Sequence, residues 1–401
     1  MKVVHISFSD TGGSGSAAIR LHRGLLDAGV DSKFLCFNKN SFEEKVYQYQ
    51  DKVALNFFKR LIQKLGIPVT KEKANQRKLK KYKGDYEIFS FPCTDFNVLS
   101  TSIVKDADII NLHWIADYLD YPTFFSGIKI PVVWTLHDKN PTLGGFHLLT
   151  DKERNPLFLM LENKLSEKKY EYIKKATNLN VVSPSQFLLN YSKSSKNLGK
   201  FQHHHIANSI DTNVFKHYEQ DIAKKVFNLP LNKKIILFLD SISYHKGADA
   251  VVKCIDNNKY EDIQFVALGI GYTSQHSNVI NIKKIENESL MAQLYSSADL
   301  FILPSREDNL PNMMLEALAC GTPVLGFPTG GIIDVIENGF NGLVTSELSA
   351  NALHIGITDF FSMSDCFDRK LIRDFSVEHF DISVQARKYK LLYNSIIENI
   401  I

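Results

Sequence analysis

The sequence predicts an α/β protein made of two doubly wound domains, each with a parallel sheet flanked by helices. Three observations support this fold class: apolar, β-branched runs recur along the chain, helix-length segments separate them, and 401 residues exceed one ordinary core. Nearly continuous apolar strands that alternate with helices are typical of buried parallel sheets. Ten strands are predicted, five in each half of the chain, at residues 2–8, 32–37, 106–114, 131–138, 178–185, 233–241, 263–271, 279–285, 298–305 and 322–327.

The composition narrows the class of function. A formal net charge of +3 is too small to indicate a nucleic-acid-binding protein. The five cysteines are scattered and form no C-x-x-C pair, which argues against a disulfide framework or a zinc site and favours a reducing cytoplasm. The apolar run in residues 1–10 is too short for a signal peptide, and no run approaches the ~18 apolar residues of a membrane span. We therefore expect a cytoplasmic globular protein.

The first predicted strand leads into a glycine cluster and then a helix. Gly13, Gly15 and Ala18 match the G-x-G-x-x-A dinucleotide fingerprint, a spacing that also arises readily by chance. A dinucleotide site would need an acidic residue at the end of the second strand to bind the ribose. That strand ends instead in Asn38 and Lys39. The glycine loop is therefore better interpreted as a close backbone approach to a phosphate ligand of another kind.

Residues 52–83 differ in charge from the rest of the chain. This segment carries eleven Lys or Arg residues and one acidic residue, Glu72. Its apolar side chains at Phe57, Phe58, Leu61, Ile62 and Leu65 fall near one face of a predicted helix. A basic amphipathic helix can lie on an anionic membrane surface. An equally weighted alternative is a solvated helix whose apolar stripe packs on its own domain.

The strongest signal for a site lies in residues 303–344. A strand ends near its start, a loop follows, and Pro311 is expected in the first turn of the next helix. Asp308 then lies in the loop and Glu316 on the helix, at the strand edge where α/β domains bind ligands. The following strand leads into a glycine pair, 330–331, before another helix, and free backbone N–H groups there would suit a phosphate.

This stretch resembles the nucleotide- and carbohydrate-binding segment of the family-four retaining glycosyltransferases, which have the GT-B fold. Their E-x(7)-E-A motif corresponds to Asp308-x(7)-Glu316-Ala317, followed by similar C-G-T-P-V and T-G-G segments at residues 320–324 and 329–331. Four further segments are similar to the family's glycine loop, T-L-H-D segment, domain-end strand and N-G-I-D-x-x-x-F linker, at residues 12–26, 135–147, 182–188 and 208–215. These segments occur in the family's order, and together they cover most of the chain.

The resemblance implies roles for individual residues. Glu316 corresponds to the acid that binds the ribose hydroxyls, Asp308 to the acid that faces the transferred sugar, and Lys246 to the lysine that neutralises the diphosphate. His137 corresponds to the histidine near the reaction centre, and these four residues form the expected catalytic set. The expected donor-binding set is Gly12, Gly13, Ser241, Lys246, Glu307, Asp308, Asn309, Leu310, Pro311, Glu316, Gly330 and Gly331.

These roles agree with the chemistry of glycosyl transfer. The leaving diphosphate gains negative charge and the sugar gains positive charge, so a cation and carboxylates should face the breaking bond. The family needs no metal cofactor, and the Asp106-x-Asp108 pair only leads into a strand. Gly13 and His147 are the candidate acceptor residues, the latter because it follows a glycine turn at residues 144–145.

Two positions depart from the family pattern. The first acid of the pair is usually Glu, and Asp308 is one methylene shorter, so the neighbouring Glu307 is an alternative residue to face the sugar. Ser241 stands where the family usually has an arginine that binds the diphosphate. His245 and Arg20 are candidate substitutes for that missing cation.

The resulting expectation is a retaining, metal-independent glycosyltransferase of the bacterial surface-polysaccharide type. An amino-terminal domain, residues 1–207, would bind the acceptor, and a carboxyl-terminal domain, residues 208–384, would bind the nucleotide sugar across an interdomain cleft. The last helix, residues 385–401, is expected to pack on the first domain. The expected donor carries a hexose or N-acetylhexosamine, with a UDP-sugar favoured, and the expected acceptor is a lipid-linked glycan in polysaccharide or O-antigen synthesis.

The expected location is the cytoplasm, with peripheral contact to the inner membrane face through residues 52–83. Two alternatives remain open: a catalytically silent protein that binds sugar nucleotides or glycans, and an NAD-dependent oxidoreductase. The first is suggested by Ser241 and Asp308, and the second only by the glycine fingerprint.

Two further features have structural explanations. The tract His203–His205 is predicted to lie on a strand, where successive side chains point to opposite faces and cannot easily converge on one ion. Trp114 and Trp134 are expected to be core residues because they lie on predicted strands.

Overall fold

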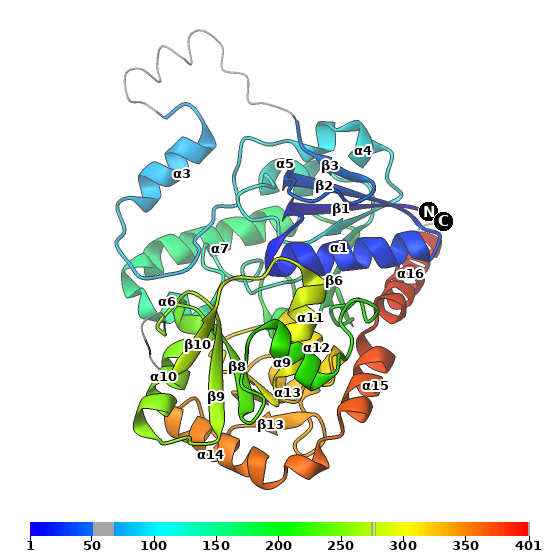
Figure 1. Ribbon diagram of the computed structural model, residues 1–401. Helices are drawn as coiled ribbons and strands as arrows, with labels where there is room; N and C mark the ends of the chain where they lie inside the picture. Colours follow the sequence, from blue (N-terminus) through cyan, green and yellow to red (C-terminus); the bar gives the residue numbers. More distant parts are fainter. Residues whose placement is uncertain (51–67, 274–275, 277, 400–401) are drawn as a thin grey trace. The chain divides into compact units, whose positions relative to one another are not determined.

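The computed structural model describes residues 1–50, 68–273, 276 and 278–399, and the chain divides into two compact units (Figure 1). Unit 1 comprises Met1–Ile206 and Ala386–Ile401, and unit 2 comprises Ala207–Gln385. The boundaries expected from the sequence, after residues 207 and 384, each differ from these by one residue.

Unit 1 contains a seven-stranded sheet in the order β3-β2-β1-β4-β5-β6-β7, and its strand pairs are parallel. The strands are β1 (Lys2–Ser9), β2 (Asp31–Asn38), β3 (Val46–Gln48), β4 (Ile109–Leu112), β5 (Val132–Thr135), β6 (Leu179–Ser183) and β7 (Gln202–His205). Its helices include α1 (Gly12–Asp27), α3 (Lys71–Leu79), α4 (Ser102–Lys105), α5 (Tyr121–Gly127), α6 (Leu149–Arg154), α7 (Leu159–Ile173) and α8 (Gln186–Ser194). The strand order reverses between β1 and β4, and such switch points are where open α/β sheets bind ligands.

Unit 2 contains a six-stranded parallel sheet in the order β10-β9-β8-β11-β12-β13. The strands are β8 (Lys234–Asp240), β9 (Ile263–Gly269), β10 (Val279–Ile282), β11 (Leu300–Leu303), β12 (Val324–Gly326) and β13 (Gly342–Val344). Its helices include α9 (Gln220–Val226), α10 (Ala248–Asn257), α11 (Glu288–Ser297), α12 (Asn312–Ala319), α13 (Ile332–Val335), α14 (Ala350–Ser362) and α15 (Arg369–Phe380). Here the order reverses between β8 and β11, so the same rule places a ligand site at their carboxyl ends.

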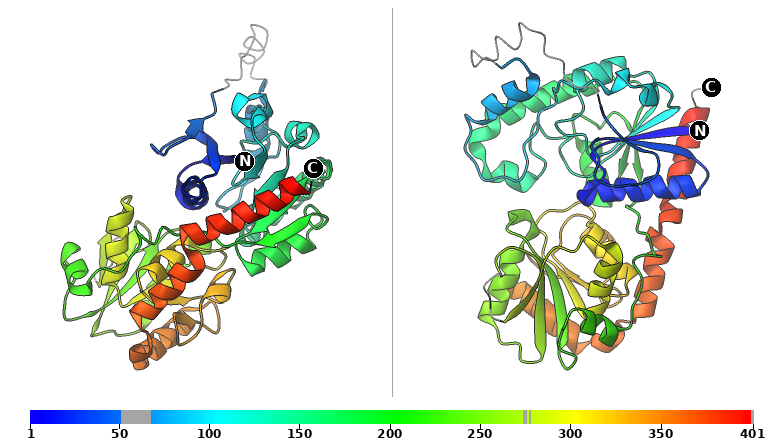
Figure 2. Two further views of the ribbon diagram at one scale, coloured as in Figure 1. Left: turned by 90° about the vertical axis from the view of Figure 1, so that its right-hand side faces the viewer. Right: turned by 45° about the horizontal axis from the view of Figure 1, so that its top comes forward.

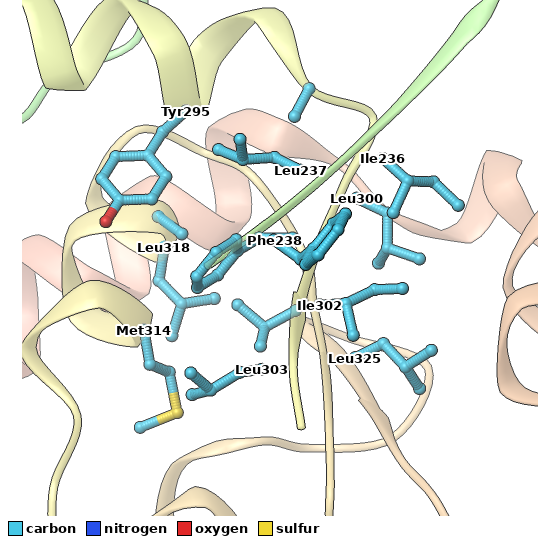
Figure 3. Packing of buried hydrophobic residues seen from close by; sticks show 14 of the residues in the cluster. Ile236, Leu237, Phe238, Tyr295, Leu300, Ile302, Leu303, Met314, Leu318 and Leu325 are labelled. Atoms are coloured by element: carbon cyan, nitrogen blue, oxygen red, sulfur yellow. The ribbon is translucent and has the colours of Figure 1, made fainter. Parts of the chain in front are cut away.

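The central strands are apolar because helices cover them. Every residue of β4, β5 and β11 is buried. In unit 2, Phe238 and Ile302 of the central strands lie beside Met314 and Leu318 of α12 (Figure 3). Each such side chain contributes about 1.5–3 kcal/mol of transfer free energy when it leaves water. This packing holds α12, and with it Glu316, at the switch point.

The last helix, α16 (Ile382–Glu398), belongs to unit 1 from Ala386 onward. It packs against β1 and α1 through an apolar cluster that includes Val3, Leu21 and Tyr393, so the red helix ends near the amino terminus in Figures 1 and 2. The Tyr393 hydroxyl accepts from Asn111 at 2.7 Å, and the Tyr389 hydroxyl lies 3.0 Å from the Thr135 hydroxyl.

Three strands were not located by apolar runs: β3, β7 and β13; of these, only β7 was expected as a strand, from the histidine tract. Two of them have three residues each, and β7 has the sequence QHHH, which lacks β-branched residues. Their pairing partners lie elsewhere in the chain, so the strand conformation depends on the sheet edge rather than on local propensity.

The basic segment is only partly described. The predicted amphipathic helix with Phe57, Phe58, Leu61, Ile62 and Leu65 lies outside the described residues. The remainder includes α3, whose Thr70 side chain caps its first turn by accepting from Lys73 N. Among the described residues, no helix combines the length and apolar character that crossing a bilayer requires.

Candidate active site

Three loops of unit 2 meet at its switch point. They follow β8, β11 and β12, and they contain Lys246, Asp308 and Gly330. Backbone hydrogen bonds join them: Arg306 N donates to His245 O at 2.7 Å, and Gly331 N donates to Asn309 O at 2.6 Å. The Thr329 hydroxyl donates to Ser305 O at 2.6 Å. The loops therefore form one connected platform.

Two glycines allow the loops to approach this closely. Gly247 has φ +70°, and a Cβ there would lie 1.9 Å from Pro304 O. Gly330 has φ +51°, and a Cβ there would lie 1.8 Å from Asp308 O. Only glycine tolerates both the left-handed backbone and the contact, so each glycine sets the distance between two loops of the site.

Lys246 and Asp308 form the central ion pair of this platform, with Lys246 Nζ 2.7 Å from Asp308 Oδ2. Their side chains are 29% and 17% exposed, so both are accessible to a ligand. Partly exposed ion pairs are weak, typically about 0–1 kcal/mol. A ligand with more negative charge than one carboxylate can therefore compete for the lysine.

Arg306 is a nearby cation that the sequence analysis did not identify. Its Nη1 and Nη2 donate to the two carboxylate oxygens of Asp249 at 2.7 and 2.8 Å, and its guanidinium lies over the Tyr244 ring at 4.4 Å. The hydrogen bonds from Arg306 hold the pKa of Asp249 below its usual range. Arg306 thus orders the loop before Lys246.

Glu316 lies on α12 and is 9% exposed. The Tyr295 hydroxyl, from α11, donates to Glu316 Oε2 at 3.0 Å. This bond fixes the orientation of the side chain.

Other predicted donor residues lie on the same loops of unit 2. Glu307 is buried, while Ser241 lies at the end of β8, where its hydroxyl accepts from Ser243 N at 3.2 Å. Pro311 is the residue before α12 rather than within its first turn. The expectation of a free N–H at Gly331 is wrong, because that group donates to Asn309 O.

Unit 1 presents the glycine loop at its own switch point. Gly12 has φ +80°, and a Cβ at Gly12 or Gly13 would meet no atom within 4 Å. A Cβ at Gly15 would lie 2.8 Å from Asp10 C, so this glycine serves the packing of α1 on β1. Arg20 is 2% exposed on α1, a position that does not suit a phosphate-binding cation.

The polar centre of unit 1 is a row of histidines. His5 Nδ1 lies 2.9 Å from His113 Nε2, and His113 Nδ1 lies 3.1 Å from His137 Nε2. His5 and His113 are buried, and His137 is partly exposed. Burial lowers the pKa of all three, that of His137 to about 4. The three imidazoles are therefore neutral at physiological pH.

A second network lies beside this row. Asp138 Oδ2 accepts from Trp114 Nε1 at 2.7 Å and lies 2.5 Å from His147 Nδ1. Burial alone would raise the pKa of Asp138, but these donors hold that pKa below its usual range. His147 is 4% exposed, so the prediction that it contacts the acceptor does not fit its position. Trp134 is core as predicted, whereas Trp114 is partly exposed and belongs to this network.

Unit 1 also contains a cavity of about 270 Å³ near the carboxyl ends of β1 and β2. Aromatic rings and carboxylates line it, including Phe8, Phe37, Phe89, Phe91, Phe96, Glu72, Asp95 and Asp117. Asp117 has φ +52°, and its Oδ1 accepts from Phe91 N at 3.0 Å. Aromatic faces with carboxylates suit an uncharged polar ligand better than an anion.

The histidine tract does not form a metal site. His203, His204 and His205 lie on β7 and contact three different groups: Ser192 Oγ at 3.0 Å, Asn180 Oδ1 at 3.1 Å and Pro184 O at 3.3 Å. Across the part of the chain that the structure describes, no group of three or more His, Cys, Asp or Glu residues could hold a metal ion.

The two doubly wound units, with the ion pair at the switch point of unit 2, define an α/β protein with the GT-B fold. Residues 219–373, which lie within unit 2, match the family model "Glycosyl transferases group 1". This part of the chain therefore matches a glycosyltransferase family, and the predicted resemblance and fold class are confirmed.

Curated relatives match over parts of their length. The chain is 28% identical to a glycogen synthase of Thermodesulfovibrio yellowstonii over 45% of this chain and 39% of that protein. It is 24% identical to an N-acetyl-alpha-D-glucosaminyl L-malate synthase of Bacillus anthracis over 64% of this chain and 67% of that protein. It is also 24% identical to the N,N'-diacetylbacillosaminyl-diphospho-undecaprenol alpha-1,3-N-acetylgalactosaminyltransferase of Campylobacter jejuni. That match covers 46% of this chain and 52% of that protein.

Solved structures match over the full length and bear on the fold. Sucrose-phosphate synthase from Thermosynechococcus elongatus has a TM-score of 0.71 at 15% identity, covering 100% of both chains. A structure of HepE from Anabaena, in complex with UDP-glucose, has a TM-score of 0.62 at 16% identity, covering 98% of this chain and 100% of that one.

Proposed function

We propose that the protein is a retaining, metal-independent glycosyltransferase that moves a hexose or N-acetylhexosamine from a nucleotide sugar, preferably a UDP-sugar, to a glycan. The carrying observation is the Lys246–Asp308 pair, 2.7 Å apart, at the switch point of the unit that matches the family. The UDP preference is supported by the structural likeness to HepE, whose structure contains UDP-glucose.

In the proposed reaction the bond between the anomeric carbon and the leaving phosphate oxygen breaks. A bond from the acceptor oxygen forms on the same face, and the acceptor proton passes to the departing phosphate. Lys246 stabilises the charge that develops on the diphosphate, and Asp308 stabilises the positive charge that develops on the sugar. Glu316, oriented by Tyr295, accepts hydrogen bonds from the ribose hydroxyls.

Asp308 rather than Glu307 is the proposed sugar-facing acid. The Asp308 carboxylate already lies beside Lys246 and keeps exposed surface, whereas Glu307 is 7% exposed. A carboxylate next to the lysine lies near the junction between sugar and phosphate when the lysine binds that phosphate.

The proposed acceptor is a lipid-linked glycan of polysaccharide or O-antigen synthesis. The Campylobacter jejuni relative is named for a diphospho-undecaprenol acceptor, which supports this class. We assign the terminal acceptor sugar to the 270 Å³ cavity of unit 1, because sugar C–H faces pack on aromatic rings and sugar hydroxyls donate to carboxylates. The acceptor domain would then be unit 1.

A lipid-linked acceptor also fits the proposed peripheral location on the inner face of the cytoplasmic membrane. The basic segment 52–83 would bind the anionic leaflet. Flotation with acidic vesicles tests this: replacing Lys73, Arg77 and Lys78 of α3 by Glu should reduce binding. The same replacement at the surface residues Lys193, Lys196 and Lys200 is the matched control, and equal flotation of the two variants would contradict the role of the segment.

Thermal unfolding with UDP-, GDP-, ADP- and dTDP-sugars, NAD and NADP, all with EDTA, tests the donor class. A ligand at 100 times its dissociation constant stabilises the folded state by ~2.7 kcal/mol. We expect a shift with one class of sugar nucleotide, followed by release of its nucleoside diphosphate when a glycan acceptor is added.

The same experiment distinguishes the alternatives. Binding without turnover on any acceptor tested would favour a silent sugar-nucleotide-binding protein, as Ser241 and Asp308 suggest. A shift with NAD alone would favour an oxidoreductase, although β2 ends in Asn38 without an acid for the ribose.

A further inference from the structure

The histidine row of unit 1 has two possible proton arrangements. In one, His5 Nδ1–H donates to His113, whose Nδ1–H donates to Nε2 of His137, which leaves the proton of His137 on Nδ1. In the other, every proton is on the opposite nitrogen, and His5 Nε2 carries one. Because both links are single hydrogen bonds of 2.9 and 3.1 Å between neutral rings, the two ends of the row cannot be set independently.

The inner end of the row distinguishes the two arrangements. His5 is 0% exposed, and its Nε2 has no hydrogen-bond partner among the described residues. The Phe34 ring stacks on His5 at 5.9 Å, and the His22 ring meets it edge to face at 5.8 Å. A proton on His5 Nε2 would therefore be a buried donor without an acceptor, and buried orphan N–H groups are rare.

His22 cannot act as that acceptor, because both of its ring nitrogens are occupied. His22 Nε2 lies 2.8 Å from the carbonyl oxygen of Glu44, which can only accept, so this nitrogen carries the proton. His22 Nδ1 then accepts from the Ser32 hydroxyl at 2.7 Å.

The outer end of the row differs because His137 is partly exposed. A proton on His137 Nδ1 reaches solvent or a ligand, so it is not an orphan. We infer that His5 and His113 are positioning residues that hold His137 as the neutral Nδ1–H tautomer, with its N–H directed to an oxygen of the substrate. The identity of the substrate rests on the proposed function. The tautomer of His137 is independent of that function.

The tautomer limits what His137 can do. Its Nδ1 is already protonated and its Nε2 accepts from His113, so neither nitrogen can take a proton from the acceptor hydroxyl. His137 therefore orients a substrate oxygen by donating to it and does not act as a general base. Deprotonation of the acceptor then falls to the departing phosphate.

Nitrogen NMR of the ligand-free, full-length protein labelled with 15N-histidine tests the tautomer directly. Long-range proton–nitrogen correlations distinguish a protonated from an unprotonated ring nitrogen, and the signals of His137 are assigned by their loss in His137→Gln. We expect His137 protonated on Nδ1, in at least roughly tenfold excess over the other tautomer. A protonated Nε2 on His137, or a doubly protonated ring at pH 7, would overturn the inference.

Variants at His113 test the positioning role. His113→Gln keeps one acceptor and one donor, whereas His113→Phe has neither, and His204→Phe is a control outside the row. We expect His137 to become a mixture of tautomers in His113→Phe, with kcat lowered on the order of tenfold, and to stay protonated on Nδ1 in His113→Gln. A single Nδ1–H tautomer in folded His113→Phe would show that the row does not set it.

The two kinds of failure are distinguishable. If the protein transfers no sugar to any acceptor, the proposed function fails while the NMR result on His137 stands. If His137 has the opposite tautomer in an active enzyme, only the positioning role fails.

Discussion

At the switch point of unit 1, where the strand order reverses between the parallel strands β1 and β4, the polar side chains are imidazoles bonded to one another. At the same topological point of unit 2, between β8 and β11, they are a lysine and an aspartate that keep exposed surface. The histidines are neutral because burial lowers their pKa, whereas Lys246 and Asp308 form an ion pair accessible to a ligand.

Under the proposed function, one topology would serve two kinds of recognition. A diphosphate needs positive charge that can be released from an internal partner, and in the proposed mechanism the weak, partly exposed Lys246–Asp308 pair would provide it. Uncharged hydroxyls are recognised better by neutral donors and acceptors of fixed orientation, which a buried network provides. The predictions below follow from this contrast and are ordered by expected effect.

The largest effect is expected from Lys246→Ala. The variant removes the cation proposed to stabilise the leaving diphosphate, so kcat/KM should fall by roughly 100-fold or more. Steady-state rates with the donor found in the thermal screen measure this. Lys253→Ala is the control, because Lys253 is 70% exposed and lies 3.9 Å from Asp249. Near-normal activity of folded Lys246→Ala would remove Lys246 from the mechanism.

Asp308→Asn should separate turnover from binding. Without the carboxylate, positive charge on the sugar is less stabilised and Lys246 has no internal partner, so kcat should fall about tenfold or more while UDP binds equally well or more tightly. Calorimetric titration with UDP and initial rates give the two quantities. Asp256→Asn, at a 55%-exposed side chain on α10, is the control. Loss of UDP affinity together with turnover would instead assign Asp308 to nucleotide binding.

Mild acid should destabilise unit 1 more than unit 2. His5, His113 and His137 have folded-state pKa values below the unfolded value of about 6.5, so the unfolded chain binds more protons and stability falls as the pH falls from about 6.5 toward 4. The loss between pH 7 and 5 should be on the order of 1 kcal/mol or more.

Tryptophan fluorescence measures this loss, because both tryptophans of the chain, Trp114 and Trp134, belong to unit 1. Amide exchange in the peptides that contain β8 and β11 reports unit 2 in the same samples. Equal loss of stability in the two units between pH 7 and 5 would contradict the prediction.

The smallest effect is expected from Tyr295→Phe. The variant removes the hydroxyl that donates to Glu316, so the free energy of unfolding should fall by about 1 kcal/mol and nucleotide affinity by a few-fold. Tyr389→Phe is the matched control in unit 1, because it removes a hydroxyl bonded to Thr135. It should cost similar stability and leave nucleotide affinity unchanged. Chemical denaturation and calorimetry measure both quantities, and equal affinities in the two variants would remove Tyr295 from the site.

Much of the fold and part of the candidate site were predictable from local patterns. Apolar runs of strand length located ten of the thirteen strands in the described part of the chain, and the Asp308-x(7)-Glu316 spacing placed one acid in a loop and the other on α12. The free N–H expected at Gly331 was wrong because its acceptor, Asn309, belongs to a different loop. The interdomain cleft and the roles of the individual site residues stay predictions.

The sequence by itself determined the fold class, the division into two units and the position of the motif residues, because these depend on hydrophobic period and on spacing along the chain. Only the tertiary structure decided how those residues are paired. His5 and His113 are 108 residues apart, Lys246 and Asp308 are 62 apart, and Arg306 and Asp249 are 57 apart. Such pairs form when the parallel sheets bring distant parts of the chain side by side, and no local pattern encodes which of those parts meet.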